Sequence, residues 1–204
     1  MYYALAVRRA FLIAMLAAPA AAAPRDKPGD LVELTSYVPD AVIDMRYATA
    51  NNFTKTKLYP VARCKLRRSV ATRLAKAASK LRNQDRRLLV WDCYRPKSIQ
   101  DVLWKQVPDE RYVANPANGS RHNRGAAIDL GLVDKAGDPV TLPTAFDDFT
   151  EAAHRDQALK GEHGVEARRL EAAMKAAGFV GIPTEWWHFD APDASSFPMS
   201  DEPL

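Results

Sequence analysis

Two short segments of the chain combine the residue types from which catalytic metal sites are built. One runs from Ser120 to Asp129 and contains His122; the other is Glu185-Trp-Trp-His188. The chain has only 4 His among 204 residues, so two of them in such company are informative. Two His and one carboxylate with an open fourth position form the ligand set of a catalytic zinc, whereas structural zinc usually has four Cys or His ligands. We therefore predict one zinc ion per chain, bound by His122, Asp129 and His188.

The spacing of the first two ligands requires a turn between them. Seven residues of extended strand would separate His122 from Asp129 by about 23 Å, whereas ligand atoms lie about 2 Å from a shared zinc. Gly125 can adopt a positive φ angle, so the chain can turn there. In a strand that follows this turn, Ile128 and Leu130 can face the core while Asp129 faces a cleft.

The second segment supplies a candidate acid and base. Residues three apart on a regular strand face opposite sides, so Glu185 and His188 share a site only if Glu185 lies just before the strand, which Pro183 allows. A carboxylate beside a metal, but not bound to it, can take a proton from the attacking water and pass it to a leaving amine. We predict this role for Glu185. The alternatives are a core histidine at 188 and a solvated loop acid at 185.

The elements that would position these residues follow from apolar periodicity. Helical spacing predicts helices over residues 67–82, after Pro96 and over residues 165–177, the last ended by Gly178. Short apolar runs predict strands over residues 88–91, 126–133 and 186–190. The strands lack helical crossovers of constant length, so we predict an α+β domain with a largely antiparallel sheet and flanking helices. A single domain would span residues 24–204, with a coil tail from about residue 191.

The first 23 residues have the layout of a secretory signal peptide. A basic segment ends at Arg8-Arg9, an apolar run covers residues 10–18, and small residues precede Pro24. That run is about half of the roughly 20 residues that a membrane-spanning helix needs, and no later stretch approaches this length. We predict export to the periplasm and no membrane span after cleavage; the alternative is an uncleaved N-terminal anchor.

The two cysteines bear on the cellular compartment of the protein, and the net charge bears on the class of partner that it binds. Cys64 and Cys93 are the only cysteines, and an even pair in an exported chain usually forms a disulfide bond, although two buried free thiols are the alternative. The net charge is 29 minus 25, or +4, and removal of a leader with two arginines and no acid lowers it to +2. This charge disfavours a nucleic-acid partner.

Together, the two metal segments resemble the zinc D-alanyl-D-alanine dipeptidases related to the vancomycin-resistance dipeptidase. The resemblance rests on the pattern Ser120-x-His122-x-x-Gly125-x-Ala127-x-Asp129 followed by Glu185-x-x-His188. It extends through residues 44–49, 52–53, 92–96 and 146–147, and so covers nearly all of the chain from about Leu31 to Asp190. It implies the fold shared by D-Ala-D-Ala metallopeptidases, lysostaphin-type endopeptidases and the hedgehog N-terminal domain, an antiparallel sheet with the zinc cleft on one face.

The resemblance also implies an activity, the zinc-dependent hydrolysis of the free dipeptide D-Ala-D-Ala to D-alanine by metal-activated water. Glu185 would be the catalytic carboxylate, and Arg95 would reach the scissile carbonyl. A fixed guanidinium there stabilises the developing oxyanion more than the ground-state amide. Without the resemblance, Arg95 would be read as a surface arginine that covers Trp91 or Tyr94.

Three further residues would contact the dipeptide. The family pattern implies that Asp147 meets the substrate ammonium, and that Ser120 and Tyr47 contact polar ends of the substrate. Asp148 is the alternative acid because it directly follows Asp147. Turn capping would explain Asp147 and Ser120 without a substrate, and core packing would explain Tyr47.

Two other functions are compatible with the same residues. The first is a D,D- or L,D-carboxypeptidase or an endopeptidase acting on peptidoglycan stem peptides, which differs in whether the cleft is capped to demand a free amino group. The second is a catalytically inactive zinc module that binds cell-wall peptides. The presence of Glu185 and Arg95 argues against the second function, because a binding module has no need of a base.

Overall fold

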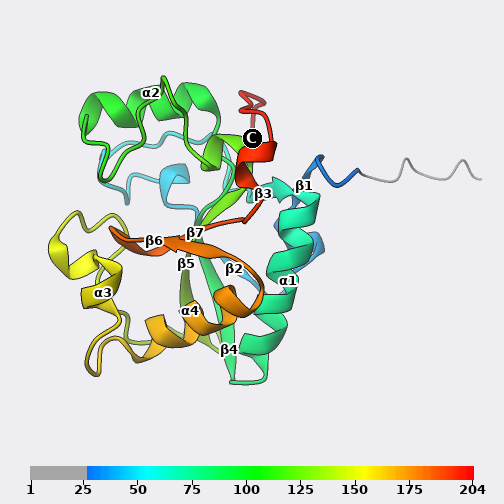
Figure 1. The fold of residues 1–204 in the computed structure, drawn as a ribbon, viewed down its shortest axis with the longest axis vertical. Helices are drawn as coiled ribbons and strands as arrows, with labels where there is room; N and C mark the ends of the chain where they lie inside the picture. Colours follow the sequence, from blue (N-terminus) through cyan, green and yellow to red (C-terminus); the bar gives the residue numbers. More distant parts are fainter. Residues whose placement is uncertain (1–26) are drawn as a thin grey trace, which may run out of the picture.

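The computed structural model describes residues 27–204 (Figure 1), and the predicted signal peptide over residues 1–23 lies outside this range. The strands are β1 (Leu31–Glu33), β2 (Val42–Ile43), β3 (Lys65–Arg67), β4 (Arg86–Asp92), β5 (Ala127–Asp134), β6 (Val180–Ile182) and β7 (Glu185–Asp190). The α-helices are α1 (Arg68–Arg82), α2 (Lys97–Gln106), α3 (Arg155–Ala158) and α4 (Val165–Ala176). No helix within the described range has the length and apolar character needed to span a bilayer.

The main sheet has five strands in the order β2-β4-β5-β7-β6. The short strand β2 runs parallel to β4, and all other neighbours in this sheet are antiparallel. A separate two-stranded antiparallel sheet joins β1 to β3. The fold is therefore the predicted α+β class with a largely antiparallel sheet.

Helices α1 and α4 cover one face of the main sheet and contact each other, while α2 lies on the other side (Figure 1). The buried positions of α1 recur every three to four residues, as a helix with one core-facing side requires: Val70, Leu74, Ala77, Ala78 and Leu81. Strand β5 is buried on both faces, with Ile128 and Leu130 fully buried. Because side chains alternate along β5, Asp129 faces the side opposite to Ile128 and Leu130.

The short elements β1, β2, β3, β6 and α3 were not predicted from the sequence. Each has two to four residues, which is too short to show a hydrophobic period. Their pairing partners lie far away in the sequence for β1, β2 and β3, so tertiary contacts rather than local pattern determine them.

A disulfide bond joins Cys64, just before β3, to Cys93, just after β4, with Cα atoms 5.3 Å apart. The Tyr94 amide donates to the Lys65 carbonyl beside this bond at 3.0 Å. In the chain-entropy account, closing a loop of this size stabilises the fold by about 3 to 4 kcal/mol. The cross-link therefore fixes the end of β4, from which Arg95 follows.

The segment after β7 contains one short 3-10 turn, at residues 194–196, and is otherwise irregular. Residues 197–203, here called the C-terminal strap, nevertheless make specific hydrogen bonds. The Ser200 amide donates to the Asn123 carbonyl at 2.8 Å, and the Lys97 amide donates to the Ser200 carbonyl at 3.1 Å. Tyr94 Oη donates to the Glu202 carbonyl at 2.9 Å. The strap therefore braces both the turn after His122 and the start of α2.

Candidate metal centre

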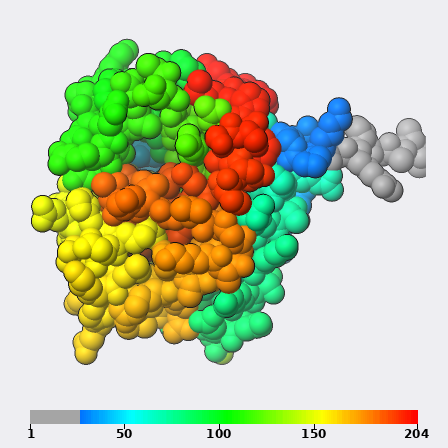
Figure 2. All heavy atoms as spheres, viewed as in Figure 1, coloured from blue at the N-terminus to red at the C-terminus, as the bar shows by residue number. Residues whose placement is uncertain are grey.

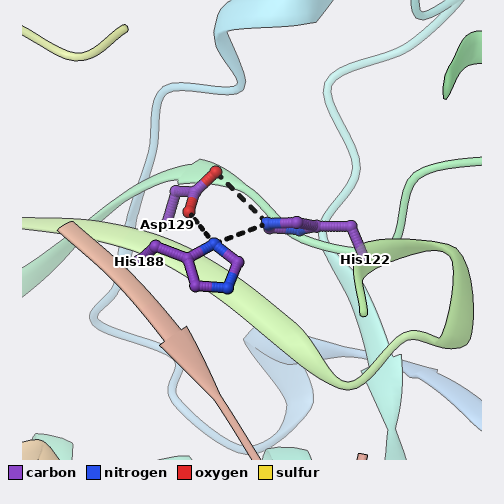
Figure 3. A group of neighbouring side chains, drawn as sticks. All are labelled: His122, Asp129 and His188. Atoms are coloured by element: carbon purple, nitrogen blue, oxygen red, sulfur yellow. Dashed lines mark hydrogen bonds and ion pairs between the residues drawn. The ribbon is translucent and has the colours of Figure 1, made fainter. Parts of the chain in front are cut away.

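Three segments bring His122, Asp129 and His188 together (Figure 3). His122 begins a 3-10 turn, and Gly125 follows it at φ 64°, which is the predicted turn. Asp129 lies on β5 directly opposite His188 on β7, because these strands pair in register. The fold thus places Asp129 and His188, which are 59 residues apart in the sequence, next to each other.

The three side chains are buried and their ligand atoms converge. His188 Nδ1 lies 3.0 Å from Asp129 Oδ1, and His122 Nε2 lies 3.4 Å from Asp129 Oδ2. The two ring nitrogens are 3.2 Å apart. All three ligand atoms lie within 4.8 Å of one another, so one cation could contact them all.

The outer nitrogen of each ring is held by an acceptor. His122 Nδ1 lies 2.7 Å from the Cys93 carbonyl, and His188 Nε2 lies 2.9 Å from Asp190 Oδ1. A carbonyl or carboxylate can only accept, so a neutral ring donates outward and keeps its other nitrogen lone pair for the centre. This arrangement, in which an outer hydrogen bond fixes the tautomer and the ring orientation, is the usual support of a metal-bound histidine.

The charges of the cluster also fit a cation. Burial disfavours the imidazolium of His188, but hydrogen bonds to Asp129 and Asp190 raise its pKa to about 10. Burial likewise opposes ionisation of Asp129, yet the two histidines lower the pKa of this carboxyl. The carboxylates around the two histidines therefore favour positive charge at the centre of the cluster. Two imidazoles and a carboxylate also match the donor set of a catalytic zinc.

Glu185 lies beside the cluster, but not where the sequence reasoning placed it. It is the first residue of β7 rather than a residue before the strand. It still shares the site, because the pairing of β6 with β7 is shifted between Gly181 and Ile182, which makes the start of β7 irregular. Its Oε2 is 3.8 Å from His188 Nδ1, and burial raises its pKa to about 8.

Arg95 is buried and held by three hydrogen bonds rather than exposed on the surface. Its Nε and Nη2 donate to Asp92 Oδ2 at 3.0 and 2.7 Å, and its Nη1 donates to Gln100 Oε1 at 2.8 Å. Burial opposes the charge, but Asp92 keeps the pKa of Arg95 well above its usual range. Two of its five N–H groups remain for another partner.

Asp92 is a supporting residue to which sequence reasoning gave no role. It is fully buried, and its Oδ1 accepts from Tyr59 Oη at 2.7 Å and from the Cys93 amide at 2.9 Å. The same carboxylate thus orients Arg95 and lies 3.7 Å from His122 Nδ1. Its position beside Cys93 and three residues before Arg95 was visible in the sequence, but its partner Tyr59 was not.

The predicted substrate contacts line the same cleft. Tyr47 Oη donates to Asp147 Oδ2 at 3.1 Å, whereas Asp148 Oδ1 accepts from the Thr150 amide in a local turn. Burial, together with the charges of Asp129 and Glu185, raises the pKa of Asp147 well above its usual range. The Ser120 hydroxyl accepts from the His122 amide at 3.2 Å and can still donate its own proton.

The cleft has a volume of about 220 Å³. Its walls come from the segment that follows α2 and from the β6–β7 hairpin, and Figure 2 shows the hollow between these two parts of the surface. It is lined by Tyr47, Arg95, Ser120, His122, Asp129, Asp147, Glu185 and His188. All the residues proposed from the sequence for catalysis, metal binding and substrate binding therefore face one space.

Comparison with known proteins adds independent information. Residues 27–202 match the peptidase M15 family, described as D-ala-D-ala dipeptidase. A D-alanyl-D-alanine dipeptidase of Escherichia coli (strain K12) is 39% identical over 171 residues, which cover 83% of this chain and 89% of that protein. One from Enterococcus faecium is 32% identical over 179 residues, which cover 76% of this chain and 89% of that protein.

A solved structure is also similar. It is that of the vancomycin resistance D,D-dipeptidase VanXYg in complex with a D-Ala-D-Ala phosphinate analogue. The match covers 82% of this chain and 69% of that chain, with 22% sequence identity and a TM-score of 0.41. This likeness is distant, and the sequence matches carry the family assignment.

Proposed function

The chain belongs to the peptidase M15 family of D-Ala-D-Ala dipeptidases, and from this premise we propose that it hydrolyses the free dipeptide D-Ala-D-Ala to two molecules of D-alanine. The observation that carries the proposal is the cleft itself. A His-Asp-His cluster, a separate carboxylate 3.8 Å from one of its histidines and a fixed guanidinium face the same space. Metal-assisted hydrolysis needs these groups, and a peptide-binding module does not.

The proposed metal is zinc, held by His122 Nε2, His188 Nδ1 and a carboxylate oxygen of Asp129. When bound, zinc supplies Lewis acidity that activates water and polarises a carbonyl group. The protein side chains perform the remaining tasks. Cys93 and Asp190 keep the two imidazoles oriented through their outer nitrogens.

Glu185 is proposed to move the proton. As the water oxygen bonds to the scissile carbonyl carbon, the Glu185 carboxylate accepts a proton from that water. It then delivers this proton to the amide nitrogen as the C–N bond breaks, so that D-alanine leaves as a neutral amine. Arg95 donates its free N–H groups to the oxygen on which negative charge develops, and Asp92 and Gln100 hold it there.

Asp147, Tyr47 and Ser120 are proposed to recognise the two ends of the dipeptide. Burial and the charges of Asp129 and Glu185 raise the pKa of Asp147 despite the charge of Arg95, so a substrate ammonium would stabilise the carboxylate further. Tyr47 Oη, which donates to Asp147, fixes that carboxylate. The Ser120 hydroxyl can donate to a polar end of the substrate. A small cleft of this composition suits a zwitterionic dipeptide.

We also propose that the protein acts in the periplasm. The layout of residues 1–23 supports export. The Cys64–Cys93 disulfide supports it independently, because such bonds persist in oxidising compartments. An exported dipeptidase meets the dipeptide outside the cytoplasm, where cell-wall peptides are turned over.

Chromatography of the products tests the proposed function directly. The purified, zinc-loaded protein is incubated with D-Ala-D-Ala and, separately, with L-Ala-L-Ala. We expect free alanine from the D,D-dipeptide and little from the L,L-dipeptide. Absence of hydrolysis of D-Ala-D-Ala by a folded, metal-loaded protein would refute the proposal.

The metal assignment gives a first prediction. His122→Ala and His188→Ala are each expected to lose the roughly one zinc per chain that the wild type holds, because two remaining ligands cannot define the site. His163→Ala, at an exposed histidine, is the matched control and should keep its zinc. Metal analysis of the purified variants decides the matter, and full zinc content in both ligand variants would overturn the assignment.

Arg95 gives a second prediction. In Arg95→Lys the ammonium can still pair with buried Asp92, but it lacks the planar fork that serves Asp92, Gln100 and the oxyanion at once. We expect kcat to fall about a hundredfold, as for the loss of an oxyanion donor. Arg111→Lys, at an exposed arginine on the rim, is the control and should retain kcat. An unchanged kcat in Arg95→Lys would remove Arg95 from the reaction.

A further inference from the structure

One arginine outside the proposed site donates hydrogen bonds to the backbone of two site residues, Glu185 and His188. Arg155, the first residue of α3, has a side chain that is 12% exposed. Its Nη2 donates to the carbonyl oxygens of Glu185 and His188 at 2.9 and 2.7 Å. Its Nε donates to the Ile182 carbonyl at 2.9 Å, and its Nη1 pairs with the Glu171 carboxylate. Four of its five N–H groups are thereby used, and three of these bonds go to the β6–β7 hairpin.

These bonds occupy the place where β6 fails to pair with β7. Gly181 pairs with Phe189 and Ile182 pairs with Glu185, so residues 186–188 have no partner in β6. Along a regular strand successive carbonyl groups point to opposite edges, and residues three apart cannot share one donor on one edge. Here the carbonyls of Glu185 and His188 converge on a single nitrogen. Arg155 therefore supplies the donors that β6 lacks at this bulge.

The surroundings are shaped to hold a guanidinium. A Cβ atom added at Gly181 would lie 2.1 Å from Arg155 Cζ, so only glycine leaves room for the group. Arg155 Cζ also lies 4.7 Å from the centre of the Phe189 ring, within range of a cation–π contact. Glu171 on α4 provides the opposite charge. The space left by Gly181, the ring of Phe189 and the charge of Glu171 therefore all favour a planar cation at this position.

We propose that Arg155 is a positioning residue for the reaction. By bridging the carbonyls of Glu185 and His188, its guanidinium holds the bulge that turns both side chains into the same cleft. Bulges of this kind re-aim side chains next to active sites. The inference rests on the proposed function in that Glu185 and His188 act there as proton carrier and zinc ligand; Arg155 itself touches neither zinc nor substrate.

The test compares Arg155→Met with Arg86→Met. Arg86 is the matched control because it also pairs with a glutamate of α4, Glu166, through Nε and Nη2, but its contacts lie away from the β6–β7 hairpin. The measurements are the zinc dissociation constant by chelator competition, kcat and KM for D-Ala-D-Ala, and the Tm. We expect Arg155→Met to weaken zinc binding about tenfold or more and to lower kcat by tenfold to about a hundredfold. KM should change much less, and Arg86→Met should lower only the Tm.

Gly181→Ala provides a second route to the same displacement. It leaves Arg155 unmutated, but the new methyl group collides with the guanidinium and forces it to move. We expect weaker zinc binding and lower kcat here also, which keeps the proposal testable if Arg155→Met does not fold. Arg155→Lys retains the charge but not the fork, and should rescue neither quantity fully. A folded Arg155→Met protein with zinc affinity and kcat within about twofold of the wild type would overturn the proposal. So would zinc affinity and kcat equal to those of Arg86→Met.

The zinc measurement separates this inference from the function on which it rests. If the wild type binds zinc but does not cleave D-Ala-D-Ala, the proposed substrate is wrong. The zinc affinities of Arg155→Met and Gly181→Ala then still decide whether Arg155 positions His188.

Discussion

Replacing Glu185 with Gln is expected to lower kcat for D-Ala-D-Ala about a thousandfold, within the range of general acid–base contributions. The amide preserves the shape of the side chain but cannot accept the proton of the attacking water or deliver it to the leaving amine. Zinc content and the Tm should stay close to those of the wild type, because Glu185 is not among the three converging ligands. Steady-state kinetics with metal analysis of the same preparation make the measurement.

The control for this variant is Glu110→Gln, which alters an exposed carboxylate on the rim of the same cleft. It should keep kcat, because Glu110 lies outside the proposed machinery. If Glu185→Gln turned over D-Ala-D-Ala at nearly the wild-type rate, the proton-transfer role would belong to another group.

Acetylating the amino group of D-Ala-D-Ala is expected to lower kcat/KM by about a hundredfold to several thousandfold, equivalent to about 3 to 5 kcal/mol. Burial and the charges of Asp129 and Glu185 raise the pKa of Asp147. A cation that enters the cleft would therefore stabilise the ionised form of this carboxyl group. The neutral acetamide removes that cation. Rates for the free and the acetylated dipeptide, measured with one enzyme preparation, give the ratio.

Asp147→Asn should erase most of this discrimination, because an amide has no charge to pair with the ammonium. Asp148→Asn is the matched neighbour and should keep it, since Asp148 caps a local turn instead. Equal rates for both substrates with the wild type would make the protein a carboxypeptidase or endopeptidase rather than a dipeptidase.

Much of the candidate site could be predicted because its chemistry is concentrated in two short segments. His122, Asp129 and His188 stand out by residue type in a chain with few histidines, and Gly125 marks the turn that lets the first two meet. The longer helices and strands were also predictable, since each is long enough to show its own period. Gly178, at φ 85°, ends α4 close to the predicted position.

The supporting contacts could not be predicted, because they join residues that only the tertiary fold brings together. Tyr59 reaches Asp92 across 33 residues, and Arg155 reaches Glu185 across 30. The placement of Glu185 was wrong for the same reason. Glu185 was placed before the strand because a regular strand would turn it away from His188, whereas Glu185 begins β7 and a bulge opposite β6 makes that start irregular.

The C-terminal strap has a consequence for the order in which the protein matures. A ribosome synthesises residues 197–203 after every segment that they contact. Until then, the turn after His122 and the backbone at Lys97 lack their hydrogen bonds to Ser200. A nascent chain therefore holds His122 on an unbraced turn until this last segment of the fold has been made. Tight metal capture should thus follow the completion of synthesis rather than accompany it.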